Sequence, residues 1–168
     1  MDDHRKIQAY IAFTCPVCQA YHGLISHWGS TLPKGWGFEF VPVVVPERDS
    51  VLAARSFYAV RNKRPERLND FMLASFTAIQ QQGKDPRNEG TWVQILRDLR
   101  ITGIEDAWRD VPEKQVLAPL EKLVKYKINA TPSLVIDGRY IITPDNTNGD
   151  HSLFIQLANG MVSKAMAT

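Results

Sequence analysis

The 168-residue chain has an ordinary composition, with 44% hydrophobic and 23% charged residues and a formal net charge of +2 at pH 7. This length and composition predict one globular domain large enough to bury a proper core, and they argue against a disordered chain. The small net charge gives no reason to expect a nucleic-acid partner, and we interpret the basic residues within 61–67 as solvated surface.

No apolar run approaches the roughly 20 residues needed to span a bilayer. Residues 1–6 also lack the apolar stretch of a secretion signal. We therefore expect a cytoplasmic protein if the chain is complete. If a signal or anchor preceded residue 1, we expect a protein of the periplasm or cell envelope.

The first predicted elements surround the only two cysteines of the chain, Cys15 and Cys18. An apolar run at residues 7–14 predicts a strand that ends just before Cys15. From Pro16 onward, apolar residues recur at helical spacing until about residue 32, and proline suits the first turn of a helix. The cysteine pair is therefore expected where a strand passes into a helix.

A second strand is predicted at residues 38–45, where Pro42 cannot donate a ladder hydrogen bond and so indicates a sheet edge or a bulge. This strand completes a βαβ unit with an expected right-handed crossover. A long, mostly helical stretch follows, from about residue 47 to residue 127. Prolines and glycines divide it, and Pro119 should start or kink its last helix. We expect a small helical cap inserted into an α/β domain.

The chain then returns to strand-like sequence at residues 133–136 and 139–142. The intervening Asp137-Gly138 pair is typical of a β-hairpin turn. A final helix is predicted to follow, with Asp150 or Ser152 as its N-terminal cap.

The segment Cys15-Pro16-Val17-Cys18 is the most informative motif of the chain. Two thiols at this spacing can close a small disulfide, and the N–H groups at the start of a helix favour a thiolate. Such a disulfide contributes little as a structural staple, because the loop that it closes is short. We therefore interpret the pair as a redox device.

A zinc site is the competing interpretation, because Cys15, Cys18, His22 and His27 include the right ligand types. Three of these side chains would project from one helix, whereas zinc sites of this class use two well-separated ligand pairs. We expect no metal here, and we expect His22 and His27 to be surface or half-buried helix residues.

A larger ordered set carries a family resemblance: Phe13-Thr14-Cys15-Pro16-Val17-Cys18 opening a helix, a helical insertion, Thr131-Pro132 before a strand, and Ile136-Asp137-Gly138-Arg139-Tyr140 with Pro144 beyond. In this set the chain resembles the DsbA-type thiol-disulfide oxidoreductases over most of its length. The resemblance implies an α/β, thioredoxin-like fold with an inserted helical subdomain. Residues 1–46 would form its first half, 47–127 the insertion and 128–168 its second half.

The resemblance also implies the site. Cys15 would be the exposed, more acidic and exchanging sulfur, and Cys18 would be shielded one turn into the helix. Pro132 would follow a cis bond and lie against the cysteine pair, while the Thr131 backbone would pair with an extended substrate segment. No cofactor is expected. The predicted substrate-binding residues are Pro16, Val17, Thr131 and Pro132.

The expected partners are cysteine-containing protein substrates and a redox partner protein that reoxidises or reduces the pair. Oxidation of substrate dithiols is the favoured direction. Two alternatives stay open: a disulfide reductase or isomerase of the same fold, and a non-catalytic binding module that retains the fold.

The chain departs from the strongly oxidising members of that family. They have a histidine where Val17 stands, a buried acid where Ala9 stands and a lysine near Phe40. Valine cannot help to stabilise a thiolate, so we expect a less oxidising disulfide. Losing the acid and the lysine together is consistent, because removing one alone would strand a buried charge. The sequence assigns no residue to handle the proton near Cys18.

Relatives also have an additional strand before the cysteine strand, and this chain is expected to lack it. The strand predicted at residues 38–45 would then have one exposed edge. Because an unpaired edge can pair with another chain, a homodimer through this edge is a hypothesis.

Overall fold

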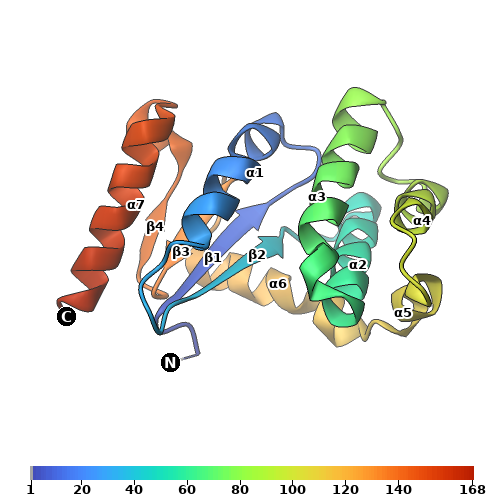
Figure 1. Ribbon diagram of the computed structural model, residues 1–168, viewed down its shortest axis with the longest axis horizontal. Coiled ribbons are helices and arrows are strands. Elements are labelled where there is room, and N and C mark those ends of the chain that lie inside the picture. Colours follow the sequence, from blue (N-terminus) through green and yellow to red (C-terminus); the bar gives the residue numbers. More distant parts are fainter. Residues whose placement is uncertain (1) are drawn as a thin grey trace. The chain divides into compact units, whose positions relative to one another are not determined.

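Residues 2–168 are described in a computed structural model of the chain (Figure 1). The strands are β1 (Lys6–Ile11), β2 (Gly37–Pro42), β3 (Ser133–Ile136) and β4 (Tyr140–Ile142). The α-helices are α1 (Pro16–Gly29), α2 (Arg48–Lys63), α3 (Leu68–Phe76), α4 (Glu89–Asp98), α5 (Ile104–Asp110), α6 (Glu113–Tyr126) and α7 (His151–Met166). A π-helical turn, Thr77–Gln81, continues α3 directly.

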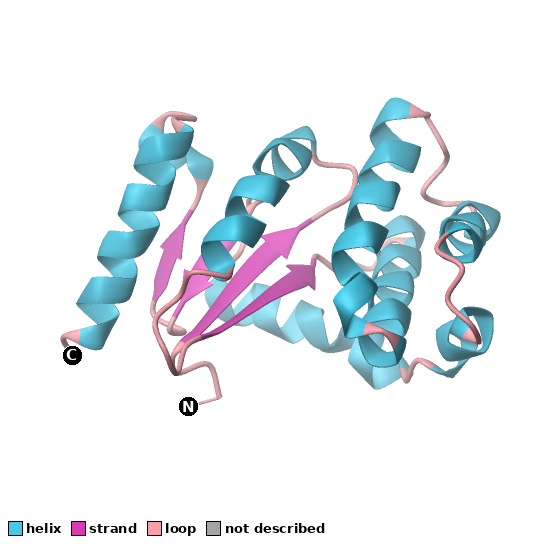
Figure 2. Cartoon of the chain, in the orientation of Figure 1, coloured by secondary structure: helices cyan, strands magenta, loops and turns pink. Residues whose placement is uncertain are grey.

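The four strands form one mixed sheet in the order β2-β1-β3-β4. The arrows of β1 and β2 run in the same direction (Figure 2), whereas β3 is antiparallel to both β1 and β4. β1, α1 and β2 thus form the predicted βαβ unit, and β3 and β4 form the predicted hairpin. β2 is an edge strand, as Pro42 indicated, and residues 2–5 precede β1 as a turn.

Some predicted boundaries differ from the observed elements. β1 ends at Ile11 rather than at residue 14, α1 ends at Gly29 rather than near residue 32, and β2 ends at Pro42 rather than at residue 45. Of the two outcomes expected for Pro119, the start of the last inserted helix is not observed. α6 begins earlier, directly after Pro112, whose carbonyl accepts hydrogen bonds from the N–H groups of Gln115 and Val116. Pro119 lies inside the helix, where its missing N–H removes a single hydrogen bond.

The chain forms two compact units. The sheet unit contains the chain up to Ile11, Val17–Val41 and Val124–Thr168. The helical unit contains Pro42–Leu123 and also the short segment Ala12–Pro16. Cys15 therefore belongs to the helical unit and Cys18 to the sheet unit.

In the sheet unit, α1 packs on the side of β2 that carries Phe38 and Phe40. A Cβ atom on Gly29 would come within 2.6 Å of the Phe38 ring, so α1 approaches β2 as closely as a glycine allows. α7 packs against α1, with a hydrogen bond of 2.8 Å from Trp28 Nε1 to Asn159 Oδ1.

The opposite face of the sheet carries polar groups. Gln8 of β1 donates from Nε2 to Glu39 Oε1 of β2 at 3.1 Å and to Asp3 Oδ1 at 3.3 Å. Because side chains alternate along a strand, Ile7, Ala9 and Ile11 lie on the α1 face. The face opposite α1 is mixed, because the same alternation places the buried Tyr10, Val41 and Val135 on it beside Gln8 and Glu39.

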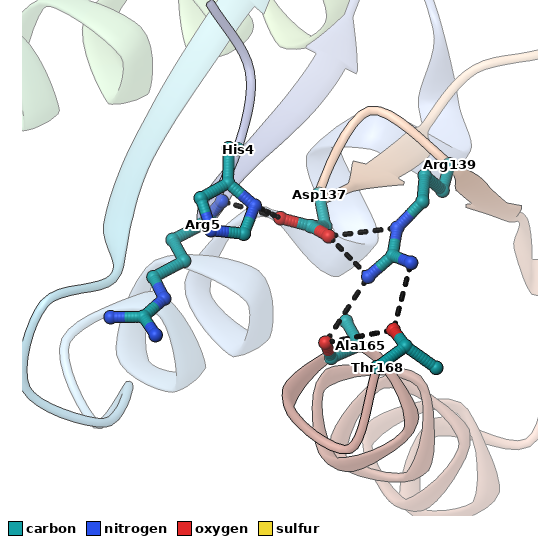
Figure 3. A network of polar contacts seen from close by, with 6 residues as sticks. All are labelled: His4, Arg5, Asp137, Arg139, Ala165 and Thr168. Atoms are coloured by element: carbon teal, nitrogen blue, oxygen red, sulfur yellow. Dashed lines mark hydrogen bonds and ion pairs between the residues drawn. The ribbon is translucent and has the colours of Figure 1, made fainter. Parts of the chain in front are cut away.

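The β3–β4 turn is tied to the start of β1 and to the end of α7 (Figure 3). Asp137 and Gly138 both have positive φ, 57° and 64°. The Asp137 carboxylate accepts from the Arg5 backbone N–H at 2.5 Å and from Arg139 Nε at 2.8 Å, and His4 Nδ1 lies 3.0 Å away. Burial alone would raise the pKa of Asp137, but these neighbours outweigh it and hold the pKa below its usual value.

Candidate active site

The two cysteines differ in exposure in the predicted sense. Cys15 directly precedes α1, is half-buried, and donates its N–H to the Ala12 carbonyl at 3.1 Å. Cys18 lies in the first turn of α1 and is fully buried, at 0% exposure. Pro16 and Val17, between them, are exposed. This arrangement offers one sulfur to a partner and shields the other.

Gln80 holds the backbone of the cysteine segment, and sequence reasoning missed it. Its side-chain amide donates to the carbonyl oxygens of Phe13 at 2.8 Å and of Cys15 at 2.9 Å. Gln80 lies in the π-helical turn that follows α3, and such turns are frequent at functional sites. The sequence signal was weak, because a single polar residue after an apolar helical stripe does not reveal its partners.

Aromatic packing in the helical unit anchors the same segment. The Phe13 ring lies 5.6 Å from the Phe71 ring, 5.1 Å from Phe76 and 5.8 Å from Trp92, measured between centroids. Phe13 is 3% exposed. The stretch that leads to Cys15 is therefore fixed by the packing of the Phe13 side chain as well as by the hydrogen bonds from Gln80 to its backbone carbonyl groups.

The Thr131–Pro132 peptide bond is cis, which confirms that prediction. Thr131 is half-buried and Pro132 is buried. In the β1–β3 register, Ser133 lies opposite Tyr10. Since the strands are antiparallel, residues 131–132 lie at the end of the sheet where β1 finishes.

The expectation that His22 would be a surface or half-buried residue is wrong, because His22 is only 2% exposed. Its ring packs against the Phe40 ring of β2 in a tilted arrangement, with centroids 5.2 Å apart and an interplanar angle of 31°. The physical reason is its place on the stripe of α1 that packs on β2. His27 is exposed, as expected. In residues 2–168, no three His, Cys, Asp or Glu side chains are grouped to hold a metal ion.

A hollow of about 460 Å³ lies beside the cysteine segment within the helical unit. It combines apolar walls with the exposed Lys84 and Asp85. Its lining residues are Thr14, Pro16, Ile79, Gln80, Gly83, Lys84, Asp85 and Pro86.

Within residues 2–168, none of the helices combines the length and the apolar character needed to traverse a bilayer.

No protein-family model matches the sequence. The chain is 22% identical over 162 residues to the thiol:disulfide interchange protein DsbA of Bordetella pertussis, and the match covers 94% of this chain and 75% of that protein. The corresponding protein of Bordetella bronchiseptica gives the same values.

Solved structures of DsbA proteins superpose closely on the chain. Pseudomonas aeruginosa DsbA has a TM-score of 0.82 at 18% identity, covering 96% of this chain and 84% of that one. The Xylella fastidiosa oxidoreductase DsbA has a TM-score of 0.80 at 21% identity, covering 97% and 87%. Klebsiella pneumoniae DsbA has a TM-score of 0.81 at 14% identity, covering 100% and 92%.

The chain therefore has an α/β, thioredoxin-like fold with a helical insertion, and the predicted fold class is confirmed. Within that class it is DsbA-like, by strong structural similarity and distant sequence similarity. It carries the Cys15–Cys18 pair at the start of α1.

Proposed function

We propose that this protein is a thiol-disulfide oxidoreductase that exchanges a Cys15–Cys18 disulfide with cysteines of protein substrates, in the direction of dithiol oxidation. One observation carries the proposal: in a DsbA-like fold, the half-exposed Cys15 directly precedes α1, while Cys18 is fully buried within that helix. The helix N-terminus favours the thiolate form of a cysteine placed there, which makes Cys15 a good leaving group.

The reaction transfers two electrons from a substrate dithiol to the protein disulfide. A substrate thiolate attacks the Cys15 sulfur, the Cys15–Cys18 bond breaks, and a mixed disulfide forms between substrate and Cys15. A second substrate thiolate then attacks the substrate sulfur of that mixed disulfide and releases the Cys15 thiolate. The substrate gains a disulfide, and the protein retains both electrons as a dithiol.

The proposed substrate surface combines exposed and partly exposed residues near the cysteines. Pro16 and Val17 are exposed beside Cys15, and Val17 is 42% exposed. Thr131 and Pro132 precede β3 at the sheet end where β1 finishes, which supports their assignment to the same surface. A substrate segment would lie extended against Thr131, in the manner of a short added strand.

The chain's own residues favour a moderate oxidant. Val17 supplies no charge beside Cys15, and the α1 face of β1 presents Ile7, Ala9 and Ile11 rather than a carboxylate. The same observation favours a reductase or isomerase as the second candidate function. The reduction potential separates the two, since strong oxidases have a potential of about −120 mV and thioredoxin has one of about −270 mV.

Dithiol oxidation requires a second protein that reoxidises the Cys15/Cys18 pair after each turnover. It also requires an oxidising compartment, because the reducing cytosol keeps such pairs as thiols. We therefore place the protein in the periplasm or cell envelope.

The test uses the purified protein, oxidised and freed of oxidant, with a peptide that carries two cysteines. We expect the peptide to gain a disulfide in one stoichiometric turnover. Cys15→Ser should abolish the reaction, and Cys18→Ser should accumulate a mixed disulfide when challenged with an oxidised peptide. Equilibration with glutathione gives the potential.

A protein that neither oxidises this peptide nor reduces an insulin-type disulfide would overturn the proposal in favour of a binding module. A potential close to that of thioredoxin, together with efficient reduction of the insulin-type disulfide, would replace oxidation by reduction as the direction.

A further inference from the structure

His22 lies one helical turn after Cys18 on the same buried stripe of α1. Cys18 is 0% exposed and His22 is 2% exposed, and Ile25 continues the stripe at 0%. Residues four apart on an α-helix are surface neighbours, with Cβ atoms about 5–6 Å apart. The two residues are therefore neighbours on the buried surface of α1.

The usual direction of side chains on an α-helix supports this placement. In an α-helix each Cα–Cβ bond tilts toward the N-terminus, so a long side chain covers the turn that precedes its own Cα. For His22 that turn contains Cys18. The tilted contact with Phe40 of β2 holds the ring against the sheet rather than in solvent.

The other ionisable groups near His22 face elsewhere. On α1, Tyr21 turns toward α7, where its ring lies 4.2 Å from the His151 ring, and His27 is exposed. On β2, Glu39 lies on the opposite face with Gln8. Within the described chain, the side chains of β1, β2 and β3 on the α1 face are apolar: Ile7, Ala9, Ile11, Phe38, Phe40, Leu134 and Ile136.

His22 is thus the ionisable side chain that shares this apolar face with the Cys18 thiol. Burial in such surroundings favours the neutral imidazole, which carries one acceptor nitrogen and one N–H donor. A neutral imidazole next to a buried thiol can accept its proton, and its N–H can stabilise a thiolate by a hydrogen bond.

We propose that His22 accepts and returns the proton of the Cys18 thiol during disulfide exchange. The proposal rests on the proposed function, and it assigns the proton handling that the sequence left without a residue. It also explains why a histidine lies on a buried stripe of α1 whose other residues, Cys18, Ile25 and Gly29, carry no ionisable group apart from the thiol.

The step concerns closure of the disulfide when Cys15 is joined to a partner sulfur. Cys18 transfers its proton to the neutral imidazole of His22, and the resulting thiolate attacks the Cys15 sulfur. The Cys15–Cys18 bond forms while the bond from Cys15 to the partner breaks. The partner sulfur leaves with the electron pair as a thiolate, and the imidazolium releases its proton to that thiolate or to water.

The reduced protein is mixed with dithionitrobenzoate, an aromatic disulfide that releases one coloured thiolate at each step. Attack by Cys15 gives the first phase, and closure by Cys18 gives the second. For His22→Phe, which retains an aromatic ring on Phe40, we expect the second phase to slow about 100-fold at pH 7. The first phase should be unchanged, and the variant's second phase should keep accelerating with pH up to the range where a thiol titrates by itself, near about 8.5.

His27→Phe is the matched control, because His27 belongs to the same helix and is exposed. Both of its phases should match those of the parent protein. A second phase in folded His22→Phe with the parent's rate and pH profile would overturn the role of His22. Absence of the first phase in the parent protein would instead overturn the proposed function.

Should His22→Phe fail to fold, nitrogen NMR of the imidazole in the parent protein provides the decision. We expect the His22 ring signals to move when Cys18 is replaced by alanine and when the pair is oxidised. Signals that stay in place in both comparisons would show that the imidazole does not sense the thiol, and would overturn the proposal.

Discussion

Gln80 is predicted to hold the Cys15 segment in place through its side-chain amide. The perturbation is Gln80→Leu, which keeps the approximate size of the side chain and removes both N–H donors. The hydrogen bonds that are lost run to the Phe13 and Cys15 carbonyl oxygens, at 2.8 and 2.9 Å. Both acceptors lie more than 60 residues earlier in the chain, so the bonds connect distant segments of the helical unit.

The expected loss of folding free energy follows from the two hydrogen bonds that the substitution removes. Each neutral hydrogen bond contributes about 1 kcal/mol net, and an acceptor left buried without a donor adds to the loss. Phe13 is 3% exposed, so its carbonyl has little access to water as a replacement. We therefore expect Gln80→Leu to lower the free energy of unfolding by about 2 to 3 kcal/mol. Gln80→Glu should be worse at neutral pH, since a carboxylate would face two carbonyl oxygens.

The assay is urea unfolding combined with hydrogen exchange at the Cys15 amide. Unfolding gives the loss of free energy, with an unchanged slope against denaturant. Hydrogen exchange shows whether the Cys15 N–H, which bonds to the Ala12 carbonyl, opens locally. The control is Gln82→Leu, because Gln82 ends the same π-helical turn and is exposed. If Gln80→Leu stayed within about 0.5 kcal/mol of that control, the reasoning would be refuted.

Three further predictions concern the scaffold. Asp137→Asn should destabilise the protein by about 2 kcal/mol at pH 7, because it weakens the charge-assisted hydrogen bonds from Arg139 and from the Arg5 N–H. The pKa of Asp137 is held below its usual value, so its carboxylate stabilises the folded protein at neutral pH, and this stabilisation is lost as the pH falls below about 4. Unfolding measured at decreasing pH should therefore show the difference in free energy of unfolding between parent and variant narrowing below about pH 4. Phe13→Ala should cost about 3–5 kcal/mol in urea unfolding, since its ring fills the space among Phe71, Phe76 and Trp92; a value under 1 kcal/mol would contradict that packing. Asp150→Ala should cost about 1 kcal/mol, because the carboxylate accepts from the Leu153 N–H at the start of α7, and Asp150→Asn should retain most of that cap.

Local sequence signals predicted the elements that local physics determines. The Asp137-Gly138 pair sits at the hairpin turn because both residues adopt positive φ, which that pair tolerates well. Asp150 caps α7 because a short acceptor side chain before an apolar helical stripe has a nearby N–H to bond. The order of strand, cysteine pair and helix was likewise predicted from the pattern of apolar residues within each segment.

Features that depend on tertiary placement escaped the sequence. Val124 is apolar and directly follows the buried Leu123 in α6, yet it is 72% exposed. The burial of His22 depends on which stripe of α1 meets β2. The partners of Gln80 depend on how a helix end meets a loop far away in sequence. None of these follows from propensity or periodicity within one element.

The two cysteines are governed by different neighbours, and this makes the two steps of exchange separable. Gln80 acts on the backbone of Cys15 within the helical unit, whereas His22 lies one helical turn after Cys18 on α1 within the sheet unit. Gln80→Leu should therefore alter the first phase of the dithionitrobenzoate reaction, in which Cys15 attacks, and His22→Phe should alter the second. In the double variant each phase should show the effect of one substitution alone, because effects on independent groups add. A second phase slowed by Gln80→Leu as much as by His22→Phe would mean that closure is limited by the position of Cys15 rather than by the proton of Cys18.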